Sequence, residues 1–177
     1  MKEIIEQAAR EEIISLYDDK NDTAGFYCGK VCAINESYVL LDHFDKIGRY
    51  GGYVILKNEN IYRVNRGSQY EKAISNLEKA YLSKHDLTVN PLTLVNDLLN
   101  YAKEKGLVLL IELCESGTDD IQGIIKDFDE KAVSLDCVDD YGNPDGTSTV
   151  FIEDVSVIKC DNTTCQGVKA LMQLSSK

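Results

Sequence analysis

Short runs of alternating apolar and polar residues fill most of the chain and predict β-strands. Gly-Gly, Asn-Glu-Asn and Pro-Asp-Gly segments lie between these runs and are typical of turns. We therefore predict one antiparallel five-stranded meander in each half of the chain. The predicted strands are 13–18, 26–34, 38–44, 53–57 and 60–64 in the first half, and 107–113, 121–128, 132–138, 147–152 and 154–158 in the second.

Helical spacing of apolar residues predicts a helix before and after each set of strands. Residues 4–8 begin the first half, and Asn90 is a helix N-cap that opens the second. Ser68 and Glu71 have the spacing of a capping box, which predicts a helix after the first set of strands. Asn162 takes the cap position after the second set.

An internal duplication relates the two halves at an offset of 94 residues, without a gap over some fifty positions. The offset places Gly29, Glu36, Val39, Leu41, Asp42, Asp45, Gly48 and Gly52 on Gly123, Glu130, Val133, Leu135, Asp136, Asp139, Gly142 and Gly146. We predict two copies, 1–85 and 90–177. Glycines inside strands mark sharp bends, and a small sheet loses its exposed edges by closing into a barrel. The expected fold class is therefore mainly β with helices (α+β), as two tandem barrels.

Each copy resembles the Sm/LSm-like family. Residues 29–35 and 123–129 are similar to the start of the first Sm motif, Gly-x-hydrophobic followed by a loop. Residues 56–61 are similar to the second motif, with Lys57 for Arg and Asn58 for Gly. The resemblance implies an N-terminal helix and five bent strands in each copy, with assembly through the edges of the fourth and fifth strands. A fused pair would supply one such joint within the chain and leave another edge for a homodimer or a larger ring.

The resemblance also implies single-stranded RNA binding, and the first copy offers the residues for it. We expect Asn35, Tyr38, Lys57 and Asn58 near the RNA and Arg49, Arg63 and Arg66 on its phosphates. Residues 46–72 have a local charge of 6 − 2 = +4, whereas the aligned residues 140–166 have 1 − 5 = −4. This contrast also fits association between copies, or a surface that drifted after duplication. Tyrosines in strands are more often packing residues than base-stacking ones.

Composition narrows the remaining function classes. The chain has 177 residues, 44% hydrophobic and 28% charged, with a net charge of −11. These values are typical of a globular protein, and so acidic a chain is a poor candidate for general nucleic-acid coating. No apolar run approaches the ~20 residues of a membrane-spanning helix. The charged N-terminus is unlike a secretory signal, so we expect a cytoplasmic protein with no membrane partner.

The residues that carry chemistry give little sign of catalysis, a metal or a cofactor. The six cysteines form no Cys-x-x-Cys pair, and we expect buried free thiols rather than disulfides or zinc ligands. His43 is expected to be half-buried in a strand. A calcium site made by the acidic residues Asp136, Asp139, Asp140 and Asp145 stays a lesser alternative. We predict a non-catalytic scaffold or protein-interaction module, with RNA binding as the alternative.

Overall fold

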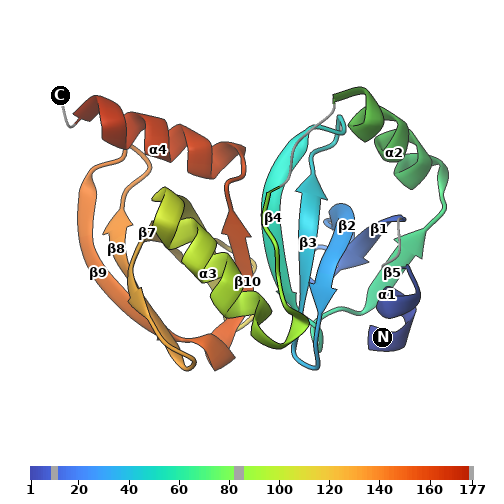
Figure 1. Cartoon of the computed structure of the whole chain (residues 1–177), viewed down its shortest axis with the longest axis horizontal. Helices are drawn as coiled ribbons and strands as arrows, with labels where there is room; N and C mark the ends of the chain where they lie inside the picture. The colour runs from blue at the N-terminus through green and yellow to red at the C-terminus, as the bar shows by residue number, and fades with distance from the viewer. Residues whose placement is uncertain (9–11, 82–85, 176–177) are drawn as a thin grey trace. The chain divides into compact units, whose positions relative to one another are not determined.

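The computed structural model describes residues 1–8, 12–81 and 86–175, which form two compact units, Met1–Leu94 and Val95–Lys177 (Figure 1). The described residues contain ten β-strands, four α-helices and two 3₁₀ turns. The protein is therefore mainly β with helices, as predicted. The predicted boundary between the copies lies between residues 85 and 90. In the structure the first unit ends at Leu94, the first residue of a helix.

The first unit follows the predicted order of helix, five strands and helix. Its elements are α1 (Lys2–Ala8), β1 (Ile13–Tyr17), β2 (Tyr27–Ile34), β3 (Tyr38–Phe44), β4 (Tyr50–Lys57), β5 (Arg63–Arg66) and α2 (Gln69–Tyr81). The capping box that begins α2 is formed. The Ser68 backbone N–H donates to Glu71 Oε2 at 2.9 Å, and the Tyr70 N–H donates to Ser68 Oγ at 3.2 Å.

The second unit repeats this order. A 3₁₀ turn, η1 (Pro91–Thr93), leads into its elements, which are α3 (Leu94–Lys105), β6 (Val108–Leu113), β7 (Ile121–Phe128), β8 (Ala132–Val138), β9 (Pro144–Phe151), the 3₁₀ turn η2 (Ile152–Asp154), β10 (Val155–Cys160) and α4 (Thr163–Ser175). Asn90 Oδ1 accepts from the Leu92 N–H and caps η1. Asn162 Oδ1 accepts from the Cys165 N–H at 2.8 Å and caps α4.

The prediction of closed barrels, and of a simple meander, is wrong in each unit. The antiparallel order is β5-β1-β2-β3-β4 in the first unit and β10-β6-β7-β8-β9 in the second, and β4 is not a neighbour of β5, nor β9 of β10. The reason is the short turn after β4. There the Asn60 N–H donates to Lys57 O and the Tyr62 N–H donates to Tyr17 O. The chain therefore passes directly to β1 and does not fold back on β4 as a hairpin.

The 94-residue offset relates the bounds of several elements in the two units and also the position of a β-bulge. It carries β2, β3, β4 and α2 onto β7, β8, β9 and α4 with identical ends. The bulge between Val31 and Ala33 recurs between Ile125 and Asp127. Gly29 and Gly123 are required by close backbone approach, because a Cβ on Gly123 would lie 2.5 Å from Asp136 O and a Cβ on Gly29 would meet Asp42 O. The glycines in the strands therefore permit tight strand packing.

Each unit packs its last helix on its own sheet. α2 contacts β1, and α4 contacts β6. The apolar cluster between α2 and its sheet includes Ile13, Cys28, Phe44 and Ile74, and the cluster between α4 and its sheet includes Val108, Leu110, Val138, Cys165 and Val168. Phe44 and Val138 are equivalent positions, as are Ile74 and Val168. The apolar core thus lies between sheet and helix in both units.

Candidate functional sites

The seven residues predicted to bind RNA lie in three places in the first unit. Asn35, Tyr38, Lys57 and Asn58 come together where β2 and β4 end and β3 begins, because the β2–β3 turn bonds to the turn after β4. Tyr38 is opposite Lys57 in the β3–β4 ladder. Arg49 lies in the turn at the other end of that hairpin. Arg63 and Arg66 are the first and last residues of β5.

The Asn35 side chain is engaged in holding the β2–β3 turn. Its Oδ1 accepts from the backbone N–H groups of Ser37 and Tyr38 at 2.9 and 2.8 Å, and its Nδ2 donates to Pro91 O at 3.0 Å. In the second unit the equivalent Asp129 accepts the same two backbone bonds, from Lys131 and Ala132. The shared geometry shows that this position shapes a turn in both copies.

The neighbouring residues are also engaged within the unit. Asn58 Nδ2 donates to Asn35 O at 2.8 Å, and Lys57 Nζ lies 2.9 Å from Glu59 Oε1. The Tyr38 side chain is buried. Arg63 lies over the Tyr17 ring at 4.2 Å and donates to Asn65 Oδ1 at 3.1 Å. Lys57, Asn58 and Arg63 thus each have a side-chain contact within the first unit.

The cysteine prediction is right for pairing and partly wrong for burial. All six thiols are free, but Cys32 and Cys114 are exposed. Burial raises the pKa of the Cys28 thiol to about 11, so this thiol stays protonated near neutral pH and is a poor nucleophile. His43 is half-buried, as expected, and its Nδ1 lies 3.2 Å from Gly51 O. Across the described ranges, no three His, Cys, Asp or Glu side chains are placed to hold a metal ion.

A cavity of about 540 Å³ in the first unit is the feature that sequence reasoning missed. Its walls come from the β1–β2 loop, the start of β2, the end of β3, the β3–β4 turn and the start of α2. Residues that line it include Asp22, Phe26, Tyr27, Phe44, Asp45 and Tyr70. Phe26 contacts Tyr17 and Tyr70 through their rings, at centroid distances of 5.1 and 5.3 Å. These residues lie far apart in the sequence, so only the succession Phe26-Tyr27 before a strand could have indicated an aromatic wall.

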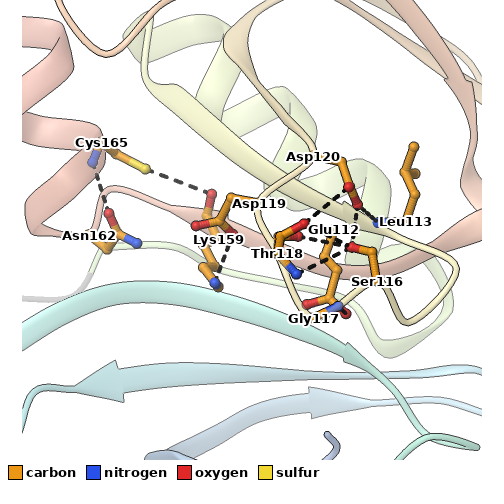
Figure 2. A network of polar contacts seen from close by, with 10 residues as sticks. All are labelled: Glu112, Leu113, Ser116, Gly117, Thr118, Asp119, Asp120, Lys159, Asn162 and Cys165. Carbon is orange, nitrogen blue, oxygen red and sulfur yellow. Dashed lines mark hydrogen bonds and ion pairs between the residues drawn. The ribbon is translucent and has the colours of Figure 1, made fainter. Parts of the chain in front are cut away.

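The corresponding loop of the second unit, between β6 and β7, folds onto itself through a polar network (Figure 2). Asp120 Oδ2 accepts from Ser116 Oγ at 2.6 Å and from the Leu113 N–H at 2.8 Å. Thr118 Oγ1 donates to Asp120 Oδ1 at 3.2 Å. Burial alone would raise the pKa of Asp120, but the bonds from Ser116, Leu113 and Thr118 lower it on balance. Asp120 therefore holds the loop as a carboxylate.

A second contact in the same region fastens this loop to the sheet. Lys159 Nζ on β10 lies 2.8 Å from Asp119 Oδ1, and Figure 2 shows this ion pair beside the loop network. The Lys159 carbonyl in turn accepts from the Cys165 thiol on α4. The loop is thus joined through one strand to the helix that covers the sheet.

Comparison of the chain with protein-family models, with curated proteins and with solved structures finds no match. Among the described residues, no helix is both long and apolar enough to cross a membrane. The functional argument therefore depends on the geometry of the two units.

Proposed function

We propose that this chain is a cytoplasmic, non-catalytic, tandem Sm-like module that assembles with protein partners, including further copies of itself, through the edges of fourth and fifth strands. The observation that carries the proposal is the strand order. The strand order ends at β5, the fifth strand of the first unit, and at β9, the fourth strand of the second. Backbone N–H and C=O groups on a terminal strand can pair with a strand of another chain.

The edge formed by β5 is short and basic. β5 pairs with β1 on one side, from Tyr17↔Arg63 to Ile14↔Arg66, and ends the strand order on the other. Arg63 and Arg66 are both exposed. Guanidinium groups at such an edge favour an acidic partner strand.

The edge formed by β9 has the complementary character. β9 pairs with β8 and ends the strand order, and most of its side chains are exposed. Phe151 is 58% exposed, Asp145 lies in the strand, and Glu153 and Asp154 follow it. Addition of the β5 edge of one copy to the β9 edge of another would pair backbones and opposite charges. A joint between two different edges gives rings or filaments instead of a simple twofold dimer.

The proposal is tested by sedimentation equilibrium of the full chain over a range of protein concentrations. We expect concentration-dependent association. Arg66→Glu should weaken it at least about tenfold, because the variant places an acidic side chain on the β5 edge, which then faces the acidic β9 edge of another copy. Asp145→Arg alone should also weaken association, and the double variant should recover part of the loss.

The matched control is Lys20→Glu. It changes the net charge as Arg66→Glu does, but Lys20 is exposed in the β1–β2 loop, away from both edge strands. Association should stay within about twofold of wild type in this control. A chain that remains a monomer at every concentration, or an equal effect of Lys20→Glu, would overturn assembly through these edges.

RNA binding by the first unit is the second candidate, and the convergence of Asn35, Tyr38, Lys57 and Asn58 favours it. Fluorescence anisotropy with short U-rich and A-rich RNA tests it at about 50 and 200 mM salt, since phosphate contacts weaken as salt rises. Binding that weakens with salt and with Lys57→Glu would support this candidate. No binding at the lower salt would exclude it and leave assembly unaffected.

A further inference from the structure

The cavity of the first unit has the size and the walls of a small-molecule site. Its volume of about 540 Å³ lies within the range of roughly 300–1,000 Å³ that is usual for ligand pockets. Aromatic side chains from one loop, two strands and a helix line it: Phe26 from the β1–β2 loop, Tyr27 from β2, Phe44 from β3 and Tyr70 from α2. Such walls favour an apolar body that can lie against ring faces.

The charges at the cavity are mostly negative. Asp22 and Asp45 line it, and Lys46 is the one Lys or Arg side chain among its described lining residues. Each carboxylate holds its own turn with Oδ1, which accepts from Ala24 and Gly25 in one case and from Ile47 and Arg49 in the other. No described residue donates a hydrogen bond to either Oδ2.

A third carboxylate lies behind the cavity wall. Glu71 is 3% exposed and accepts from Ser15 Oγ at 2.6 Å, and its charge acts on the Cys28 thiol that lines the cavity. Three carboxylates against one lysine make the potential at the cavity negative. Aromatic ring faces also attract cations.

We propose that this cavity binds a small organic cation: an ammonium group, which the Asp22 and Asp45 carboxylates attract, on an aromatic or branched apolar body, which lies among Phe26, Phe44 and Tyr70. The described residues of the second unit do not repeat the lining of this site. At the equivalent positions the second unit has Asp120 for Phe26, Val138 for Phe44 and Thr164 for Tyr70, and its loop is closed by the Asp120 network. The proposal is independent of assembly through strand edges.

The test is isothermal titration of the full chain with three ligands of nearly equal size: 2-phenylethylamine, 2-phenylethanol and 3-phenylpropionate. The amine should bind at least about tenfold more tightly than the alcohol, and the carboxylate more weakly still. In the double variant Asp22→Asn and Asp45→Asn, the amine should lose this advantage, whereas the alcohol should bind as before. Asparagine can still accept the two turn bonds, so the loops are retained.

Two further variants separate binding from folding. Asp139→Asn is the matched control, because Asp139 holds the equivalent turn of the second unit by accepting from Tyr141 and Asn143. It should leave all three affinities unchanged. Ala24→Trp introduces a bulky side chain at an exposed lining position and should abolish binding of amine and alcohol alike. The proposal is overturned if the amine does not bind, if the three ligands bind equally, or if Asp139→Asn costs as much as the double variant.

Discussion

The two units place the same elements at the same spacing, but the first unit has polar pairs between sheet and last helix where the second unit has apolar residues. In the first unit Ser15 bonds to Glu71, and Lys30 Nζ lies 2.9 Å from Glu78 Oε1. At the equivalent positions the second unit has Leu109, Cys165, Ile124 and Met172. Ile124, Cys165 and Met172 belong to its apolar cluster. The fold therefore does not require the polar groups of the first unit.

The loop after the first strand of each unit, β1–β2 or β6–β7, also differs between the two units. In the first unit this loop lines an aromatic cavity, and in the second it is closed by Asp120 and fastened by Lys159. Buried polar and charged groups stabilise a fold less well than apolar packing of the same shape. The first copy keeps polar contacts between sheet and helix as well as an open cavity, and it is therefore the copy in which we place ligand binding. In the second copy the space under the last helix is apolar and the loop is closed, so we place no ligand site there.

The largest expected effect tests what the two units share. Gly29→Ala and Gly123→Ala each place a methyl group against the neighbouring strand's carbonyl oxygen, Asp42 O or Asp136 O. Because backbone cannot move aside cheaply, each variant should lower the free energy of unfolding by about 3 kcal/mol, measured by urea denaturation. Gly167→Ala is the control, since its Cβ meets nothing within 4 Å on a helix, and it should be neutral or stabilising. Tolerance of Gly29→Ala would contradict the close approach.

The next effect sharpens the difference between Asp42 and Asp136. Asp42 is 6% exposed, and desolvation by burial raises its pKa from 3.8 to about 7, against the attraction of Lys30. Between pH 3.8 and about pH 7 the folded state therefore binds more protons than the unfolded state. The unfolding free energy should therefore fall as pH rises through this window, by up to about 1.4 kcal/mol for each pH unit.

Asp42→Asn should remove this slope and make the variant more stable than wild type at about pH 8. Urea denaturation at about pH 4, 6 and 8 measures it. Asp136 offers the matched variant, because its side chain is 51% exposed and accepts from Thr147 Oγ1. Asp136→Asn is measured beside it and should change the free energy of unfolding by about 1 kcal/mol or less, because it replaces an exposed side chain. If Asp42→Asn and wild type give parallel profiles, the carboxyl of Asp42 is not desolvated as we describe.

Local patterns were sufficient to predict most elements and the duplication. The bounds of β3, β7 and β8 follow the alternating runs, and the capping box at Ser68 and Glu71 is formed. The start of β4 was placed too late because Gly51 and Gly52 were interpreted as a turn. Gly52 instead has a φ of 85° beside the register shift between Asp42 and Phe44, where the strand continues through a bulge.

Features that depend on non-local contacts were beyond the sequence. The sheet of the first unit stays open because of the turn after β4. Backbone bonds of Asn60 and Tyr62 in this turn direct the chain to β1 and not back along β4. The cavity needs Phe26, Phe44 and Tyr70 from separate elements, and no spacing relates them. The residues predicted to bind RNA were chosen by resemblance, which does not reveal that the Asn35 side chain bonds to its own turn and to Pro91 O.

The smallest effect concerns the loop that closes the second unit. Asp120→Ala removes the acceptor for Ser116 Oγ, Thr118 Oγ1 and the Leu113 N–H. A hydrogen bond of this kind contributes about 1 kcal/mol, so hydrogen exchange at the Leu113 amide should become about fivefold faster. The global unfolding free energy should fall by about 1 kcal/mol or less. Asp119→Ala is the control, because it breaks only the ion pair with Lys159 and should leave the Leu113 amide protected. Equal exchange in both variants would mean that the ion pair, and not the Asp120 network, holds the loop that distinguishes the second unit from the first.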